Sequence, residues 1–211
     1  MSDATVSFGT EKGLTWERIE SPMLGGAIDL KDSSVFLLSL TDGEGVTDVP
    51  SSKWRVESVD RQGKRLMAVA TYAEGEASLR AVFEAKEEGR NGAMLSLAIS
   101  NAGANPVTGT LHFPFVSGVK IGTVEDTWYF CGRRGGVINR VPCYWRDEIG
   151  EAHPIQVDGF FNPTIGAGVS FMPRDMEGMF RYYRVEKDES GGRYCLEFLP
   201  QTVAPGGRWM S

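Results

Sequence analysis

The sequence contains only two histidines and three cysteines in 211 residues, and this scarcity limits the chemistry that it can carry. Cys131, Cys143 and Cys195 are odd in number and show no C-x-x-C spacing, so neither a zinc site nor a complete set of disulfides is expected. We predict buried free thiols, with a Cys131–Cys143 bridge as the alternative. No metal and no cofactor are expected.

Long apolar runs and familiar catalytic motifs are also missing. No apolar stretch approaches the roughly 18 residues of a membrane-spanning helix, so no membrane partner is expected. The amino terminus, MSDATVSFGTEKG, lacks the basic-then-apolar pattern of a secretory signal. This predicts a cytoplasmic protein if the chain is complete, and a secreted or periplasmic one if it was cut from a longer protein. There is no G-x-S-x-G nucleophile elbow, phosphate loop or histidine pair at metal-binding spacing.

Basic residues are outnumbered by acidic ones. The net charge is −6, from 22 Lys and Arg against 28 Asp and Glu. Because nucleic-acid binding needs Lys and Arg to neutralise phosphates, no nucleic-acid partner is expected. The composition, 41% hydrophobic and 24% charged, is typical of a soluble globular protein. A chain of this length can bury a stable core without metals or disulfides.

The sequence is rich in short segments that alternate between apolar and polar residues. In residues 77–86, for example, Leu79, Ala81 and Phe83 share one face, which is the period of a half-buried antiparallel strand. Turns rich in Gly and Asn separate these segments, and none shows a useful helical period. We therefore predict an all-β fold, a single domain over residues 1–211 built as a large antiparallel β-sandwich. The predicted strands are 34–41, 53–60, 65–73, 77–86, 93–101, 106–116, 165–172, 178–187 and 192–200.

Residues from about 117 to 164 form an irregular segment that is rich in glycine and aromatic residues. A long irregular segment inside a compact domain is usually functional, although short strands at 127–130 and 157–161 reduce its loop length. Sugars pack C–H groups on aromatic rings and hydrogen-bond to charged side chains, so this segment is a candidate carbohydrate site. The candidate residues are Trp128, Tyr129, Arg133, Arg134, Tyr144, Trp145, Asp147 and Glu148.

Each of these residues also has a structural interpretation. One member of a vicinal aromatic pair typically points into a core while the other points out. Arg133 and Arg134 precede two glycines, which is typical of a solvated turn. Asp147 and Glu148 are adjacent, so their side chains diverge in an extended strand and do not form a glycosidase carboxylate pair.

Four sequence segments follow one another in a characteristic order: LHFPFVSGVKIG, EDTWYF, FFNPTIGAGVSFMPRD and FLPQTVAPGGRWM. In this order the sequence resembles the galactose mutarotase-like β-supersandwich. It most resembles the amino-terminal sandwich that precedes the catalytic barrel in retaining α-glycosidase-like proteins. The resemblance implies a non-catalytic accessory domain of a glycoside hydrolase-like protein, which supports an adjacent catalytic domain and contacts carbohydrate. The catalytic residues would then lie on the barrel, so none is assigned to this chain.

Two other functions stay open. Free-standing mutarotases are similar in fold and use two histidines with a carboxylate base for proton transfer. A small epimerase of this kind would need His112 and His153 to converge with an acid, although neither matches the family's histidine signatures. His112 lies on the strand face opposite Leu111 and Phe113, and His153 lies in a loop. A purely structural or oligomerising sandwich is the third possibility, and the oligomeric state is left open.

Overall fold

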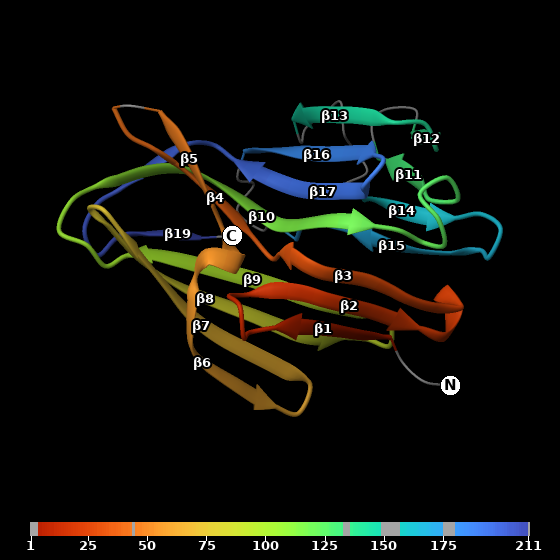
Figure 1. The fold of residues 1–211 in the computed structure, drawn as a ribbon, viewed down its shortest axis with the longest axis horizontal. Helices are drawn as coiled ribbons and strands as arrows, with labels where there is room; N and C mark the ends of the chain where they lie inside the picture. The colour runs from red at the N-terminus through yellow and green to blue at the C-terminus, as the bar shows by residue number, and fades with distance from the viewer. Residues whose placement is uncertain (1–3, 44, 133–135, 149–156, 175–179, 211) are drawn as a thin grey trace.

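The computed structural model describes residues 4–43, 45–132, 136–148, 157–174 and 180–210. These residues form β-strands apart from turns and two short 3-10 helices, η1 (Pro22–Leu24) and η2 (Ser51–Lys53). The strands lie in four antiparallel sheets (Figure 1). The predicted all-β, antiparallel fold is therefore confirmed.

The largest sheet has seven strands and runs across the upper part of Figure 1. Its order is β13-β16-β17-β10-β4-β5, and β18 also pairs with β10. Along β17 the side chains alternate between a fully buried face and a polar one, which fixes the orientation of the sheet. The strands are β4 (Leu37–Thr41), β5 (Val46–Pro50), β10 (Val107–Val119), β13 (Cys143–Glu148), β16 (Arg181–Asp188), β17 (Gly191–Phe198) and β18 (Gln201–Val203).

A five-stranded sheet of order β19-β9-β8-β7-β6 packs below it in Figure 1. Its long hairpins use tight turns with glycines such as Gly63 and Gly75, whose positive φ angles (58° and 57°) are easy only for glycine. The strands are β6 (Arg55–Gln62), β7 (Arg65–Glu74), β8 (Ala77–Glu88), β9 (Gly92–Asn101) and β19 (Arg208–Met210).

Two smaller sheets complete the sandwich. The first has the order β1-β2-β3, and its strand β3 lies beside β10. The second has the order β12-β11-β14-β15, and three of its strands, β11, β12 and β14, come from the segment predicted to be irregular. The strands are β1 (Thr5–Gly9), β2 (Thr15–Ser21), β3 (Gly26–Ser34), β11 (Trp128–Cys131), β12 (Val137–Asn139), β14 (Asp158–Asn162) and β15 (Ala167–Phe171).

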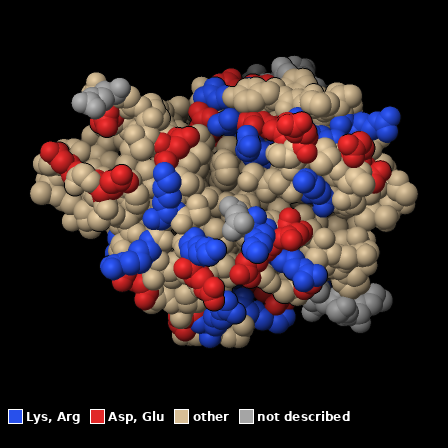
Figure 2. All heavy atoms as spheres, in the orientation of Figure 1, with Lys and Arg blue, Asp and Glu red and all other residues tan. Residues whose placement is uncertain are grey.

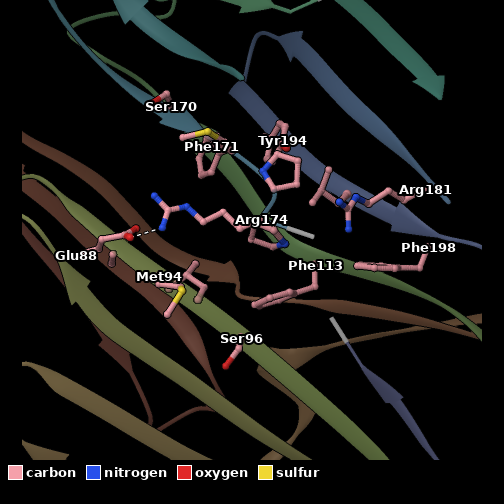
Figure 3. A pocket seen from close by; sticks show the side chains of 16 residues that line it. Glu88, Met94, Ser96, Phe113, Ser170, Phe171, Arg174, Arg181, Tyr194 and Phe198 are labelled. Carbon is pink, nitrogen blue, oxygen red and sulfur yellow. Dashed lines mark hydrogen bonds and ion pairs between the residues drawn. The ribbon is translucent and has the colours of Figure 1, made fainter. Parts of the chain in front are cut away.

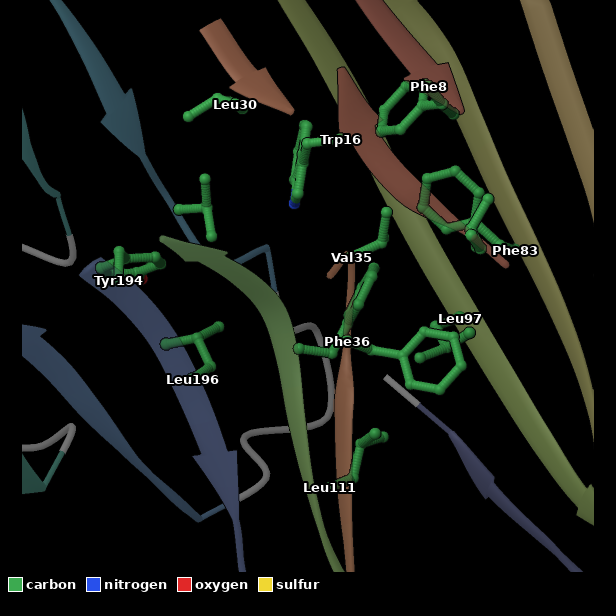
Figure 4. Close-up of a cluster of buried hydrophobic side chains, with 14 of the residues drawn as sticks. Phe8, Trp16, Leu30, Val35, Phe36, Phe83, Leu97, Leu111, Tyr194 and Leu196 are labelled. Carbon is green, nitrogen blue, oxygen red and sulfur yellow. The ribbon is translucent and has the colours of Figure 1, made fainter. Parts of the chain in front are cut away.

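One cluster of buried side chains joins the four sheets. Figure 4 shows the part of it where the seven-stranded, five-stranded and three-stranded sheets meet. Aromatic rings of this cluster make contacts between the sheets. Phe8 of β1 lies 4.9 Å from Trp16 and 5.1 Å from Phe83 of β8, measured between ring centroids. The indole Nε1 of Trp16 also donates a 2.7 Å hydrogen bond to the carbonyl oxygen of Phe115 in β10. Burial of this cluster holds the layers together, because aromatic side chains remove large apolar areas from water.

The segment from 117 to 164 is more regular than its sequence predicts. It contains β11 and β14, close to the short strands predicted at 127–130 and 157–161, and also β12 and β13. Strand β13 pairs with β16 and forms one edge of the seven-stranded sheet. The described residues of this segment therefore contribute strands to two of the sheets.

Charged side chains of both signs are interspersed over the face of the molecule seen in Figure 2. Pairs such as Arg65 with Glu84, joined by two hydrogen bonds of 2.8 Å, place opposite charges on neighbouring strands. Within the described residues no helix has the length and hydropathy to cross a membrane.

Candidate functional site

The face of the seven-stranded sheet that points away from the core carries a row of charged and hydroxyl side chains, which we call the polar face. It arises because each strand alternates, so that residues between the buried Tyr194, Leu196 and Phe198 of β17 point outward. The polar face comprises Ser39, Asp48, His112, Tyr144, Arg146, Tyr182, Arg184, Glu186, Arg193, Cys195 and Glu197.

His112 of β10 stands opposite Glu197 of β17 in the strand register. Its Nε2 lies 3.2 Å from the hydroxyl of Ser39, and that hydroxyl donates a 2.6 Å hydrogen bond to Asp48. Because the single hydroxyl proton of Ser39 is directed at Asp48, its oxygen accepts the proton of His112 Nε2, and Nδ1 carries the lone pair. This chain of hydrogen bonds fixes the orientation and tautomer of the imidazole.

The protonation of His112 is set by its surroundings. The side chain is 5% exposed, and this burial lowers the pKa of His112 despite the opposing negative charges of Glu197 and Asp48. Nδ1 is buried without a hydrogen-bond partner in the described structure. At neutral pH the imidazole is therefore mainly neutral.

Glu197 is held as a carboxylate by two arginines. Arg146 of β13 donates hydrogen bonds of 2.6 and 3.3 Å to it, and a nitrogen of Arg184 lies 3.8 Å from the same carboxylate. Burial acts to raise the pKa of Glu197, but the hydrogen bond and charge of Arg146, with further help from Arg184, outweigh it and leave the pKa lowered. A neutral imidazole and an ionised carboxylate thus stand side by side.

Further ion pairs and ring contacts extend this arrangement across β13, β16 and β17. Glu186 accepts hydrogen bonds of 2.6 Å from both Arg184 and Arg193. The Arg146 guanidinium lies 3.7 Å from the ring centroid of Tyr182, within the range of a cation–π contact. The polar face therefore combines charge, hydrogen-bond donors and aromatic rings.

Cys195 lies beneath these ion pairs and is 1% exposed. Burial raises the pKa of the Cys195 thiol to about 12, so it stays protonated and is a poor nucleophile. None of the three cysteines is in a disulfide. Cys131 and Cys195 are buried, as predicted, whereas Cys143 is only half-buried. In the described part of the chain no group of three or more His, Cys, Asp or Glu could hold a metal ion.

The structure separates the aromatic candidates of the sequence into inward and outward members. Tyr129 is 2% exposed and belongs to the core, and Trp145 packs against the core from β13. Trp128 is half-buried, with the Arg140 guanidinium 5.9 Å from its ring. Tyr144 is 62% exposed and lies on the polar face. Tyr144 stands opposite Glu186, and its ring lies 5.5 Å from the Arg184 guanidinium. The residue of β16 that stands opposite Glu197 is Tyr182.

The charged candidates are also dispersed. Asp147 and Glu148 end β13, where alternation turns Glu148 outward and Asp147 inward, as expected for neighbours in a strand. Arg133, Arg134 and His153 lie outside the described residues. Carbohydrate contact by the candidate residues stays a prediction.

Glu197, Arg146 and Arg184 were not singled out from the sequence. A signal for Glu197 is present in RYCLEF, residues 193–198, where a glutamate stands between two apolar residues of a buried strand. Its partner His112 lies in a strand that is distant in sequence, so only the strand pairing reveals that the two meet.

No family model and no curated protein matches this sequence. Several solved structures are similar in fold, including the following two. A galactose mutarotase-like protein from Lactobacillus casei ATCC 334 has a TM-score of 0.59 at 9% identity, covering 100% of this chain and 95% of that one. Slr1438 from Synechocystis sp. PCC 6803 has a TM-score of 0.56 at 12% identity, covering 99% of this chain and 90% of the other.

These coverages correct the predicted function. The accessory-domain prediction is wrong, because both similar proteins are matched over almost their whole length and not over one domain beside a catalytic barrel. The predicted fold is confirmed at the same time. The chain has the galactose mutarotase-like β-sandwich fold.

Proposed function

We propose that this protein is a mutarotase- or epimerase-like enzyme that acts on the anomeric centre of a sugar at the polar face. The observation that supports this most directly is the pairing of His112 with Glu197 on neighbouring strands, one neutral and the other ionised. Two groups that exchange protons, placed side by side on a rigid sheet, are what general acid–base catalysis needs.

The proposed reaction opens and closes the sugar ring. His112 is mainly neutral at neutral pH, so it enters this reaction in its minor, protonated form. Glu197 removes the proton of the anomeric hydroxyl, the C1–O5 bond breaks as the C1 carbonyl forms, and protonated His112 gives its added proton to O5. After rotation about C1–C2 the steps reverse, O5 attacks the other face of C1, and both groups regain their original protonation. No proton or electron is gained or lost overall.

The neighbouring side chains supply binding. The rings of Tyr182 and Tyr144 offer apolar surfaces for sugar C–H groups, and Arg184 offers donors for hydroxyls. The Arg146 side chain is 37% exposed and pairs with Glu197. In this proposal Arg146 moves aside when a sugar reaches the carboxylate, which is consistent with the small free energy of a partly exposed ion pair.

The test is the rate at which freshly dissolved α-anomers of several aldoses equilibrate, followed by NMR or polarimetry. We expect the protein to accelerate equilibration, and Glu197→Gln and His112→Asn each to lower the rate by about 100-fold or more. Glu84→Gln is the matched control, because Glu84 also has an arginine partner but lies on the five-stranded sheet. Equilibration at the spontaneous rate with every sugar, or full activity of Glu197→Gln, would refute the proposal.

A further inference from the structure

A pocket of about 280 Å³ lies on the side of the seven-stranded sheet opposite to His112. It is bordered by the core faces of β10 and β17, by β15 and by the Ala93–Ser96 part of β9 (Figure 3). Strand β19 pairs with β9 only from Ala98 to Ser100, so the pocket lies beside the part of this edge that β19 leaves uncovered.

The inner wall of the pocket is apolar. Phe113, Leu196 and Phe198 are each at most 5% exposed, and the ring of Tyr194 stacks on that of Phe171 at a centroid distance of 4.5 Å. Such a wall favours an apolar ligand body, because burial of that body removes apolar surface from water.

The outer rim combines exposed methionines with an ion pair. Met94 is 45% exposed and Met172 is 57% exposed, and methionine adapts easily to irregular apolar ligands. Arg174 pairs with Glu88 and so links the segment after β15 to the end of β8 (Figure 3). Both charged side chains are about half exposed, so this pair contributes little free energy and can open to admit a ligand.

A buried cation also lines the pocket. Arg181 is 6% exposed, and its guanidinium lies 5.9 Å from the Phe198 ring centroid. Guanidinium groups bind carboxylates through two parallel hydrogen bonds, and they do so most strongly where water is excluded. The pocket therefore offers an apolar wall for the body of a ligand and a cation for the charged end of the same ligand.

We propose that this pocket binds a small apolar carboxylate, with its acid group on Arg181 and its hydrocarbon part against Phe113 and Leu196. Its volume is nearly twice that of the roughly 150 Å³ cavity that holds benzene, which suits a ligand of about ten non-hydrogen atoms, such as octanoate. This binding site is independent of the proposed enzyme activity, because Leu196 and Glu197 point to opposite faces of β17.

The test is a titration of the full chain, labelled with ¹³C at the methionine methyl groups, with octanoate and separately with 1-octanol. We expect octanoate to shift the methyl signals of Met94 and Met172, and to leave those of Met23 and Met67, which do not line the pocket. Octanol lacks the carboxylate and should bind at least about tenfold more weakly. Absence of shifts with octanoate, or equal binding of octanol, would overturn the proposal.

Two variants sharpen this test. Ser96→Trp places a large side chain at the rim from an exposed position, and should abolish the octanoate shifts without loss of folding. Arg181→Leu should weaken octanoate at least about tenfold while leaving octanol binding unchanged. If Arg181→Leu does not fold, Ser96→Trp still decides the matter, since octanoate binding of undiminished affinity in that variant places the ligand elsewhere.

Discussion

The fold keeps the imidazole of His112 neutral, and this makes the free energy of unfolding depend on pH. Its imidazole is buried on β10, and its Nε2 hydrogen is committed to Ser39. Burial lowers the pKa of His112 below its ordinary value of 6.5. The unfolded chain, in which this histidine is solvated, therefore takes up a proton at a higher pH than the folded chain.

This difference predicts how stability depends on pH. As pH falls through about 6.5, the unfolded state gains a proton first, so His112 makes the free energy of unfolding decrease until pH passes its folded pKa. In urea unfolding experiments, the free energy of unfolding of the His112→Gln variant should decrease less between about pH 7.5 and pH 5 than that of the unchanged protein. An unchanged decrease in the variant would contradict this prediction.

Glu197 affects stability in a separate, lower pH range. Its folded-state pKa is lowered, so its contribution to stability is present above the ordinary glutamate pKa of 4.5 and is lost as pH falls through the folded pKa.

At the scale of elements, the pairing of β14 with β15 depends on glycines at close contacts. A Cβ atom added to Gly159 would lie 2.1 Å from the carbonyl oxygen of Val169, and one added to Gly168 would lie 2.5 Å from that of Phe160. Both contacts are with backbone, which cannot rotate away. The two strands can approach in this register only because neither position carries a side chain.

Gly159→Ala should therefore lower the free energy of unfolding by at least about 2 kcal/mol, since the clash must separate β14 from β15. Urea unfolding measures this change. Gly26→Ala is the matched control, because a Cβ atom there meets nothing within 4 Å, and we expect a change of less than about 0.5 kcal/mol. Equal effects of the two variants would show that steric contact at Gly159 is not the cause.

The strands that could be predicted are those whose alternation is clean. Residues 77–86 and 93–101 were predicted from their apolar face and correspond to β8 and β9. Strand β13, CYWRDE, could not be predicted this way, because aromatic and charged residues occur on both of its faces. Its identity as a strand depends on its pairing with β16, which is a tertiary interaction.

The candidate site was less predictable than the fold for a related reason. Alternation places His112 opposite Leu111 and Phe113, as the sequence indicates, but it does not say which strand lies beside β10. The strand order β16-β17-β10 places Glu197 and Arg184 close to His112, although these residues are far from His112 in the sequence. The aromatic residues of the segment from about 117 to 164 indicate a site there, whereas charged residues of β16 and β17 complete the polar face.

For the whole molecule, the buried cluster makes the four sheets one structural unit. Fully buried tryptophans come from distant parts of the chain: Trp16 lies in β2, Trp54 follows η2 and Trp209 lies in the last strand. Phe83 of β8 contacts both Phe8 of β1 and Phe113 of β10. Loss of any one layer would therefore expose apolar surface of the others.

Because the sheets share one buried cluster, we expect the chain to unfold in one cooperative transition, as a single domain would. The fluorescence of the five tryptophans, three of which are buried in separate regions of the core, reports on the core, and far-UV circular dichroism reports on all the strands, so the two urea curves should coincide. Phe83→Leu should shift both curves to lower urea by the same amount, because Phe83 lies where the layers meet. Two separate transitions, or a shift in only one curve, would mean that the sheets unfold independently despite their shared core.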